Sequence, residues 1–172
     1  MNAEAAEGRR EMHTNSGQPG PAAPSLRAVI PPQWNALTER IIGCAMEVHT
    51  ALGPGLLERI YEDALAHEFF LAGLRFQRQS ACRVVYKGVQ LSEQVFDLVI
   101  DDLVLVELKA VEKVPDAHLA TLVSYLRASG KPLGLLINFH APRLKDGIFR
   151  RINPSSPAFP NSVTSATSAF HS

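Results

Sequence analysis

The sequence has little cysteine and no excess of charge of either sign. Its two cysteines, Cys44 and Cys82, form no CxxC pair, so they are interpreted as small core residues and not as a disulfide or a zinc site. The 17 basic and 17 acidic residues balance. Counterion release therefore gives little indiscriminate affinity for nucleic acid, and any contact with nucleic acid must be local.

Long apolar runs are also missing. No stretch approaches the roughly 20 apolar residues that a membrane-spanning helix needs. The N-terminal stretch lacks the basic start and the continuous apolar segment of a secretory signal. We therefore expect a soluble, cytoplasmic protein that makes no membrane contact.

The hydrophobic content of 46% in 172 residues is enough for one sizeable core. Residues 1–30 are rich in Ala, Gly, Pro and Ser, and residues 153–172 consist mostly of Ser, Thr, Pro, Asn and Ala. Such compositions are typical of disordered tails. The sequence thus predicts one domain over residues 31–152, between two disordered tails.

Hydrophobic periodicity predicts two helices, three strands, a helix and a strand, in that order. Because a strand, helix, strand unit forms a right-handed crossover, the strand after the third helix should lie parallel to the strand before it. The predicted helices are about 35–52, a second one ending near Gly73, and 116–129; the predicted strands are 82–86, 93–100, 103–110 and 133–139, with a short edge strand at 147–152.

The predicted hairpin at 93–110 is apolar except for a few charged residues. Asp97 interrupts its first strand, while Glu107 and Lys109 project from one face of its second strand. A charge in an apolar strand costs free energy unless it is paired or binds a metal. Taken alone, however, a Glu-x-Lys pair on a half-exposed strand is usually a solvated face, and that interpretation is favoured for the pair by itself.

The register of this hairpin decides whether its acidic residues can meet. A two-residue loop at Asp101 and Asp102 would place Asp97 and Glu107 on opposite faces of the sheet. A shared site requires one more residue in the connection or a bulge. We therefore predict a three-residue loop, or a bulge between residues 95 and 105.

Several short motifs occur in a familiar order along the domain. They include GLLERIY at 55–61, YKG at 86–88, VELKAVE at 106–112, SYL at 124–126, GLLINF at 134–139 and LKDGI at 144–148. Together they resemble the GxxExxY proteins, a group within the PD-(D/E)XK nuclease superfamily. The resemblance covers residues 35–152 and implies an α/β, restriction-endonuclease-like αβββαβ core, a mixed sheet flanked by helices.

The resemblance also implies a catalytic site made of Glu58, Asp97, Glu107 and Lys109. In it Asp97 and Glu107 coordinate Mg²⁺ or Mn²⁺, Glu58 adds an acidic ligand, and Lys109 positions or activates the attacking water. Carboxylate oxygens suit such hard cations without histidine or cysteine. The implied function is a metal-dependent nuclease that cleaves phosphodiester bonds of DNA or RNA.

The sequence departs from the family pattern at two positions. Thr121 stands where the family has a glutamine four residues before Tyr125, and Phe96 replaces a small residue before the aspartate. The alternative function is a catalytically weak or inactive nuclease fold that binds nucleic acid or protein, and a third is a structural protein that self-associates. A protein partner or a homodimer fits either alternative.

Other polar residues are given a supporting or structural interpretation. Tyr125 and Thr121 are candidates to support the site, although Tyr125, like Tyr61, fits a core aromatic with a bonded hydroxyl. His49 is interpreted as a packing residue. A basic group near the end of the domain could bind phosphates, or could be a solvated edge that prevents aggregation; it comprises Arg143, Lys145, Arg150 and Arg151.

Overall fold

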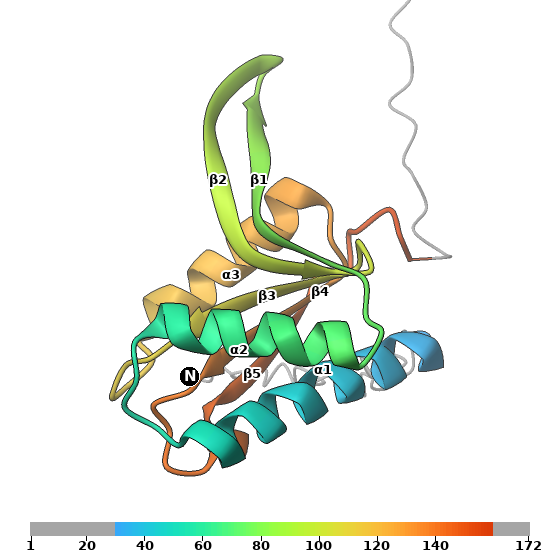
Figure 1. Cartoon of the computed structure of the whole chain (residues 1–172). Helices are drawn as coiled ribbons and strands as arrows, with labels where there is room; N and C mark the ends of the chain where they lie inside the picture. The colour runs from blue at the N-terminus through green and yellow to red at the C-terminus, as the bar shows by residue number, and fades with distance from the viewer. Residues whose placement is uncertain (1–29, 160–172) are drawn as a thin grey trace, which may run out of the picture.

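A mixed five-stranded sheet forms the centre of the protein, with helices α1 and α2 on one face and α3 on the other (Figure 1). The computed structural model describes residues 30–159. Its elements are α1 Pro32–Leu52, α2 Glu58–Leu71, β1 Phe76–Tyr86, β2 Val89–Ile100, β3 Val104–Lys109, α3 Asp116–Ser129, β4 Leu133–Asn138, the 3₁₀ helix η2 Leu144–Gly147 and β5 Ile148–Ile152. The strand order is β1-β2-β3-β4-β5, in which β3 and β4 are parallel and the other neighbours antiparallel. The predicted restriction-endonuclease-like architecture and its parallel crossover are confirmed.

The apolar run of β4 is buried on both faces of the sheet. Leu135 and Ile137 pack in the cluster that includes α1 and α2, and Leu136 packs in the cluster that includes α3. Gly134, the residue before Leu135, lets α3 approach closely, because a Cβ atom there would lie 2.9 Å from Leu122 Cδ1. Coverage on both faces explains why the alternation of a half-exposed strand is missing from this segment.

Strands β1 and β2 are longer than predicted. β1 begins at Phe76 and not near Cys82, and β2 begins at Val89 and not near residue 93. The outer halves of both strands rise from the body of the domain as a two-stranded arm (Figure 1). Because Val85 and Tyr86 remain exposed at its end, burial imposes no simple alternation there, which is why periodicity underestimated the strands.

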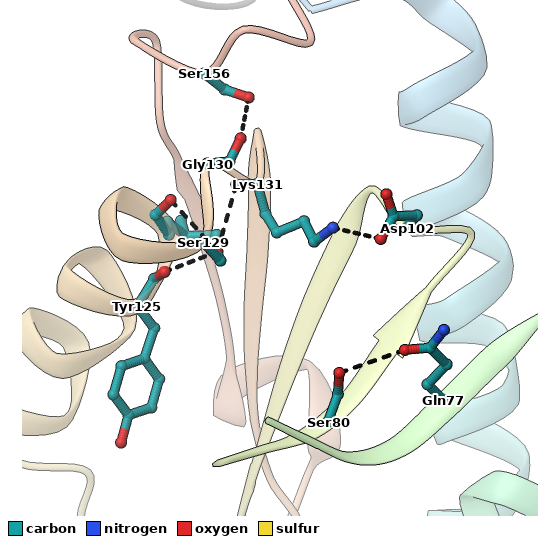
Figure 2. A network of polar contacts seen from close by, with 9 residues as sticks. Gln77, Ser80, Asp102, Tyr125, Ser129, Gly130, Lys131 and Ser156 are labelled. Atoms are coloured by element: carbon teal, nitrogen blue, oxygen red, sulfur yellow. Dashed lines mark hydrogen bonds and ion pairs between the residues drawn. The ribbon is translucent and has the colours of Figure 1, made fainter. Parts of the chain in front are cut away.

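The loop between β2 and β3 has three residues, which is the first of the two predicted alternatives. Ile100 pairs with Val104, so residues 101–103 form the connection. Asp101 and Asp102 adopt positive φ angles of 50° and 61°, which aspartate tolerates better than most residues. Asp101 accepts a hydrogen bond from Arg75 Nε at 2.8 Å, and Asp102 pairs with the Lys131 ammonium group (Figure 2).

The folded chain continues past the predicted boundary at residue 152. Asn153 Nδ2 donates a hydrogen bond to Leu126 O at 3.1 Å, and the Ser156 hydroxyl donates to the Gly130 carbonyl (Figure 2). The Phe159 ring is buried, with its centroid 5.0 Å from that of Trp34. Residues 153–159 therefore pack on the domain. The rest of the two predicted tails, 1–29 and 160–172, lies outside the described residues.

Candidate active site

Glu58, Glu107 and Lys109 meet where the start of α2 faces the end of β3. Lys109 Nζ lies 3.6 Å from Glu58 Oε1 and 3.9 Å from Glu107 Oε2, and it also donates to its neighbour's carbonyl, Leu108 O. Three of the four predicted catalytic residues are thus linked by ion pairs, although they come from segments far apart in the sequence. The lysine stands between the two carboxylates.

Asp97 completes the group from the neighbouring strand. In the antiparallel β2–β3 register Leu98 pairs with Val106. Asp97, the residue before Leu98, is therefore level with Glu107, the residue after Val106. Its Oδ2 accepts a hydrogen bond from the backbone N–H of Leu108 at 2.8 Å. This contact crosses from β2 to β3 and holds the Asp97 carboxylate beside the segment that carries Glu107 and Lys109.

Glu107 is the most perturbed group of the site. Its side chain is buried, and burial followed by the negative charge of Asp97 raises its pKa from 4.5 to about 8, an effect that Lys109 offsets only partly. Its Oε1 atom is buried without a hydrogen-bond partner. A buried carboxylate oxygen with no partner and two acidic neighbours is a location that favours a cation.

The GxxExxY spacing has a structural explanation in the turn that begins α2. The Tyr61 hydroxyl donates to Gly53 O at 2.7 Å and accepts from the N–H of Leu56 at 3.0 Å. Gly55 takes a φ of 104° in this turn, a conformation that suits glycine. The Tyr61 ring stacks on Phe139, with centroids 4.5 Å apart. Tyr61 is therefore a core aromatic with a bonded hydroxyl, as predicted, and it fixes the turn from which Glu58 projects.

Tyr125 lies near the acidic residues, whereas Thr121 makes no contact with them among the interactions described. Burial followed by the charge of Glu107 raises the pKa of the Tyr125 phenol. Its ring contacts the Phe96 ring at a centroid distance of 5.1 Å. Phe96 is thus a packing residue beneath α3. The exposed Thr121 hydroxyl donates to Ala117 O at 2.9 Å within its own helix.

The predicted basic group does not form one surface. Arg150 reaches Asn35 on α1, with a hydrogen bond of 2.9 Å, and its strand neighbour Arg151 points to the other face of the sheet because side chains alternate along a strand. Arg143 forms an exposed ion pair with Asp146. Lys145 lies in η2, which directly precedes β5.

The residues excluded from the site by the sequence interpretation have structural roles. His49 Nε2 lies 2.9 Å from Ala141 O and therefore acts as the donor of a hydrogen bond to that carbonyl. Cys44 is buried and Cys82 is half-buried, and both are free thiols. The packing interpretation of His49 is confirmed, and Cys44 is a core residue as predicted, whereas Cys82 is only partly buried against the cluster that includes α3.

Asn138 supports the site and was missed by the sequence interpretation, which treated its strand as apolar. It pairs in register with Lys109. Its buried amide donates to Val111 O at 2.8 Å and accepts from the N–H of Val111 at 3.1 Å. A polar residue at the end of an apolar strand was the available signal. Through these bonds Asn138 holds the connection that leaves the strand directly after Lys109.

Replacing Asn138 by alanine should therefore destabilise the fold. The change leaves both backbone polar groups of Val111 without their partner, and we expect a loss of about 1–3 kcal/mol in the free energy of unfolding. Chemical denaturation at neutral pH measures this loss. An unchanged unfolding midpoint would show that water replaces the amide and that Asn138 does not hold the connection.

The carboxylate oxygens of this site are ligands of the type that a divalent cation such as Mg²⁺ prefers. Within residues 30–159 no group of three or more His, Cys, Asp or Glu side chains is close enough together to form a metal-binding cluster. Asp97 and Glu107 nevertheless supply carboxylate oxygens, one of them without a partner. Magnesium needs only one or two carboxylates, since it keeps several of its waters.

Comparison with known proteins defines the class of this protein. A family model described as the PD-(D/E)XK nuclease superfamily matches residues 35–152, so the chain belongs to that superfamily. The match establishes the superfamily and not the GxxExxY group within it. Neither the curated proteins nor the solved structures that were searched include a match. In the described part of the chain, no helix is long and apolar enough to cross a membrane.

Proposed function

We propose that this protein is a metal-dependent nuclease that hydrolyses phosphodiester bonds of DNA or RNA. The observation that carries the proposal is the buried Glu107 carboxyl, with an unpartnered oxygen and a pKa raised to about 8 by burial and by its acidic neighbours. A purely structural carboxylate would be expected to have its hydrogen bonds satisfied. Perturbed acidic groups of this kind are typical of functional sites. Membership of the nuclease superfamily supports the same assignment.

Asp97 and Glu107 are the residues that would hold a Mg²⁺ or Mn²⁺ ion, with Glu58 as a further acidic ligand. When bound, such an ion polarises a phosphoryl oxygen, lowers the pKa of a coordinated water and offsets charge in an in-line displacement. The hydrogen bond from Leu108 to Asp97 orients one carboxylate, and the buried position of Glu107 limits its motion. Preorganisation of this kind lowers the cost of bringing the charged groups together.

Lys109 supplies the positive charge of the site. Its ammonium group lies within 4.0 Å of both Glu58 and Glu107, and its charge favours the ionised form of Glu107. We propose that it orients the attacking water and then stabilises the negative oxygens of the pentacovalent transition state. Both roles require an ammonium group held at this position, and a neutral side chain of similar length would lack them.

The function is tested with labelled single-stranded and double-stranded DNA and RNA in the presence of Mg²⁺ or Mn²⁺. We expect wild type to cleave at least one of these substrates and Lys109→Met to reduce the rate about 100-fold to 1000-fold. The matched control is Lys113→Met, which changes an exposed lysine four residues further along the chain. Cleavage by Lys109→Met at the wild-type rate, or no cleavage by wild type under any of these conditions, would refute the proposal.

A further inference from the structure

A polar cluster outside the four acidic and basic residues of the site connects α2 to the first strand. Glu62 on α2 is buried, and its two oxygens accept hydrogen bonds from Arg78 Nε at 2.9 Å and from Gln79 Nε2 at 3.0 Å. Arg78 also pairs with the exposed Asp63 at 2.5 Å. Both donors lie near the start of β1, which follows α2 in the chain (Figure 1).

Gln79 occupies an unusual position in this cluster. Its φ angle is 46°, although it lies within a strand, and a positive φ is uncommon and costly for a residue with a side chain. The β1–β2 register pairs Arg78 with Leu98 and Ser80 with Phe96. Gln79 therefore stands opposite Asp97, and the two residues are not paired in the ladder.

The cluster connects α2, which carries Glu58, to β1, the strand paired with the Asp97 segment of β2. Glu62 lies one helical turn after Glu58 and therefore on the same side of α2. Through Gln79 it reaches the backbone opposite Asp97. We propose that Glu62 and Gln79 are positioning residues, which hold the Asp97 segment of β2 in place relative to the Glu58 end of α2. The inference rests on the proposed nuclease function for its catalytic consequence, but its structural part is testable alone.

Because the φ angle of Gln79 is positive, its replacement by glycine can separate an effect on stability from an effect on the position of Asp97. Gln79→Gly relieves the backbone strain but removes the amide that Glu62 holds, so we expect a melting temperature within about 4 °C of wild type. Lys87→Gly is the matched control, because Lys87 has a φ of 48° at the exposed end of the arm. It relieves similar strain without touching Glu62.

The direct measurement is the amide resonance of Leu108 in the metal-free protein. Leu108 N–H donates to Asp97 Oδ2 at 2.8 Å, so a displaced Asp97 should shift this resonance upfield and speed its hydrogen exchange. We expect both changes in Gln79→Gly and in Glu62→Gln, and neither in Lys87→Gly. Asp63→Asn is the control for Glu62→Gln, because it removes only the exposed ion pair of Arg78. An unchanged Leu108 amide in a folded Gln79→Gly protein would overturn the proposal.

The catalytic consequence is read from steady-state kinetics. Displacement of a site residue by about an ångström costs on the order of 100-fold in rate, so Gln79→Gly should lower kcat about 100-fold with little change in KM. A displaced Leu108 amide with an unchanged kcat would overturn the catalytic part. If wild type itself fails to cleave, the nuclease proposal fails, while the Leu108 measurement still decides whether Glu62 and Gln79 position Asp97.

Discussion

Glu107→Gln is expected to abolish phosphodiester cleavage, with a fall in kcat of about 1000-fold or more. Glutamine has the size of glutamate but lacks the negative charge that would hold a divalent ion. It resembles the protonated carboxyl, which is the main form of Glu107 at pH 7 in the metal-free protein, because its pKa is raised to about 8. The variant should therefore fold normally, and cleavage assays combined with thermal melting measure both properties.

Glu112→Gln is the matched control for this variant, since Glu112 is an exposed glutamate in the connection after β3. It should retain the wild-type rate and the wild-type melting temperature. Mg²⁺ or Mn²⁺ should raise the melting temperature of wild type and of Glu112→Gln, but not that of Glu107→Gln. Full activity of Glu107→Gln would remove the metal site from Glu107 and favour the binding-protein alternative.

The stability of the metal-free protein is expected to fall as the pH rises from about 5 to 8.5, by about 3 kcal/mol more in wild type than in Glu107→Gln. The pKa of Glu107 is raised from 4.5 to about 8 in the folded state. Below pH 4.5 the Glu107 carboxyl is protonated in both the folded and the unfolded state, so it does not change the free energy of unfolding. Between these values unfolding releases a proton, so higher pH favours the unfolded chain. Urea unfolding of both proteins at several pH values measures the difference.

Divalent ions provide the control for this pH dependence. A cation bound at Glu107 favours the ionised carboxylate, so saturating Mg²⁺ should restore most of the lost stability at pH 8.5 and little of it at pH 5. Identical pH profiles for wild type and Glu107→Gln would mean that Glu107 titrates normally. In that case the site would not need an additional positive charge, and the nuclease proposal would lose the observation on which it depends.

The order of the elements and the register of the hairpin could be predicted from the sequence, because both depend on residues close together in the chain. Apolar, β-branched runs on either side of an acidic turn identified β3. Helical spacing, with Pro115 before it and Gly130 after it, identified α3 and its bounds. The family resemblance implies that Asp97 and Glu107 share a face, and this requirement predicted either a three-residue loop or a bulge. That loop is present. The same local reasoning identified Tyr61 as a core aromatic with a bonded hydroxyl, which the structure shows.

The tertiary structure decided the environment of each group. The raised pKa of Glu107 results from burial and from charges on other segments, and no local pattern contains that information. The same is true of the amide bonds of Asn138 and of the link from Glu62 to Gln79. The sequence by itself therefore determined which elements form and which residue types the site contains. Proximity, burial and charge balance depend on packing between distant segments, and only the folded chain defines them.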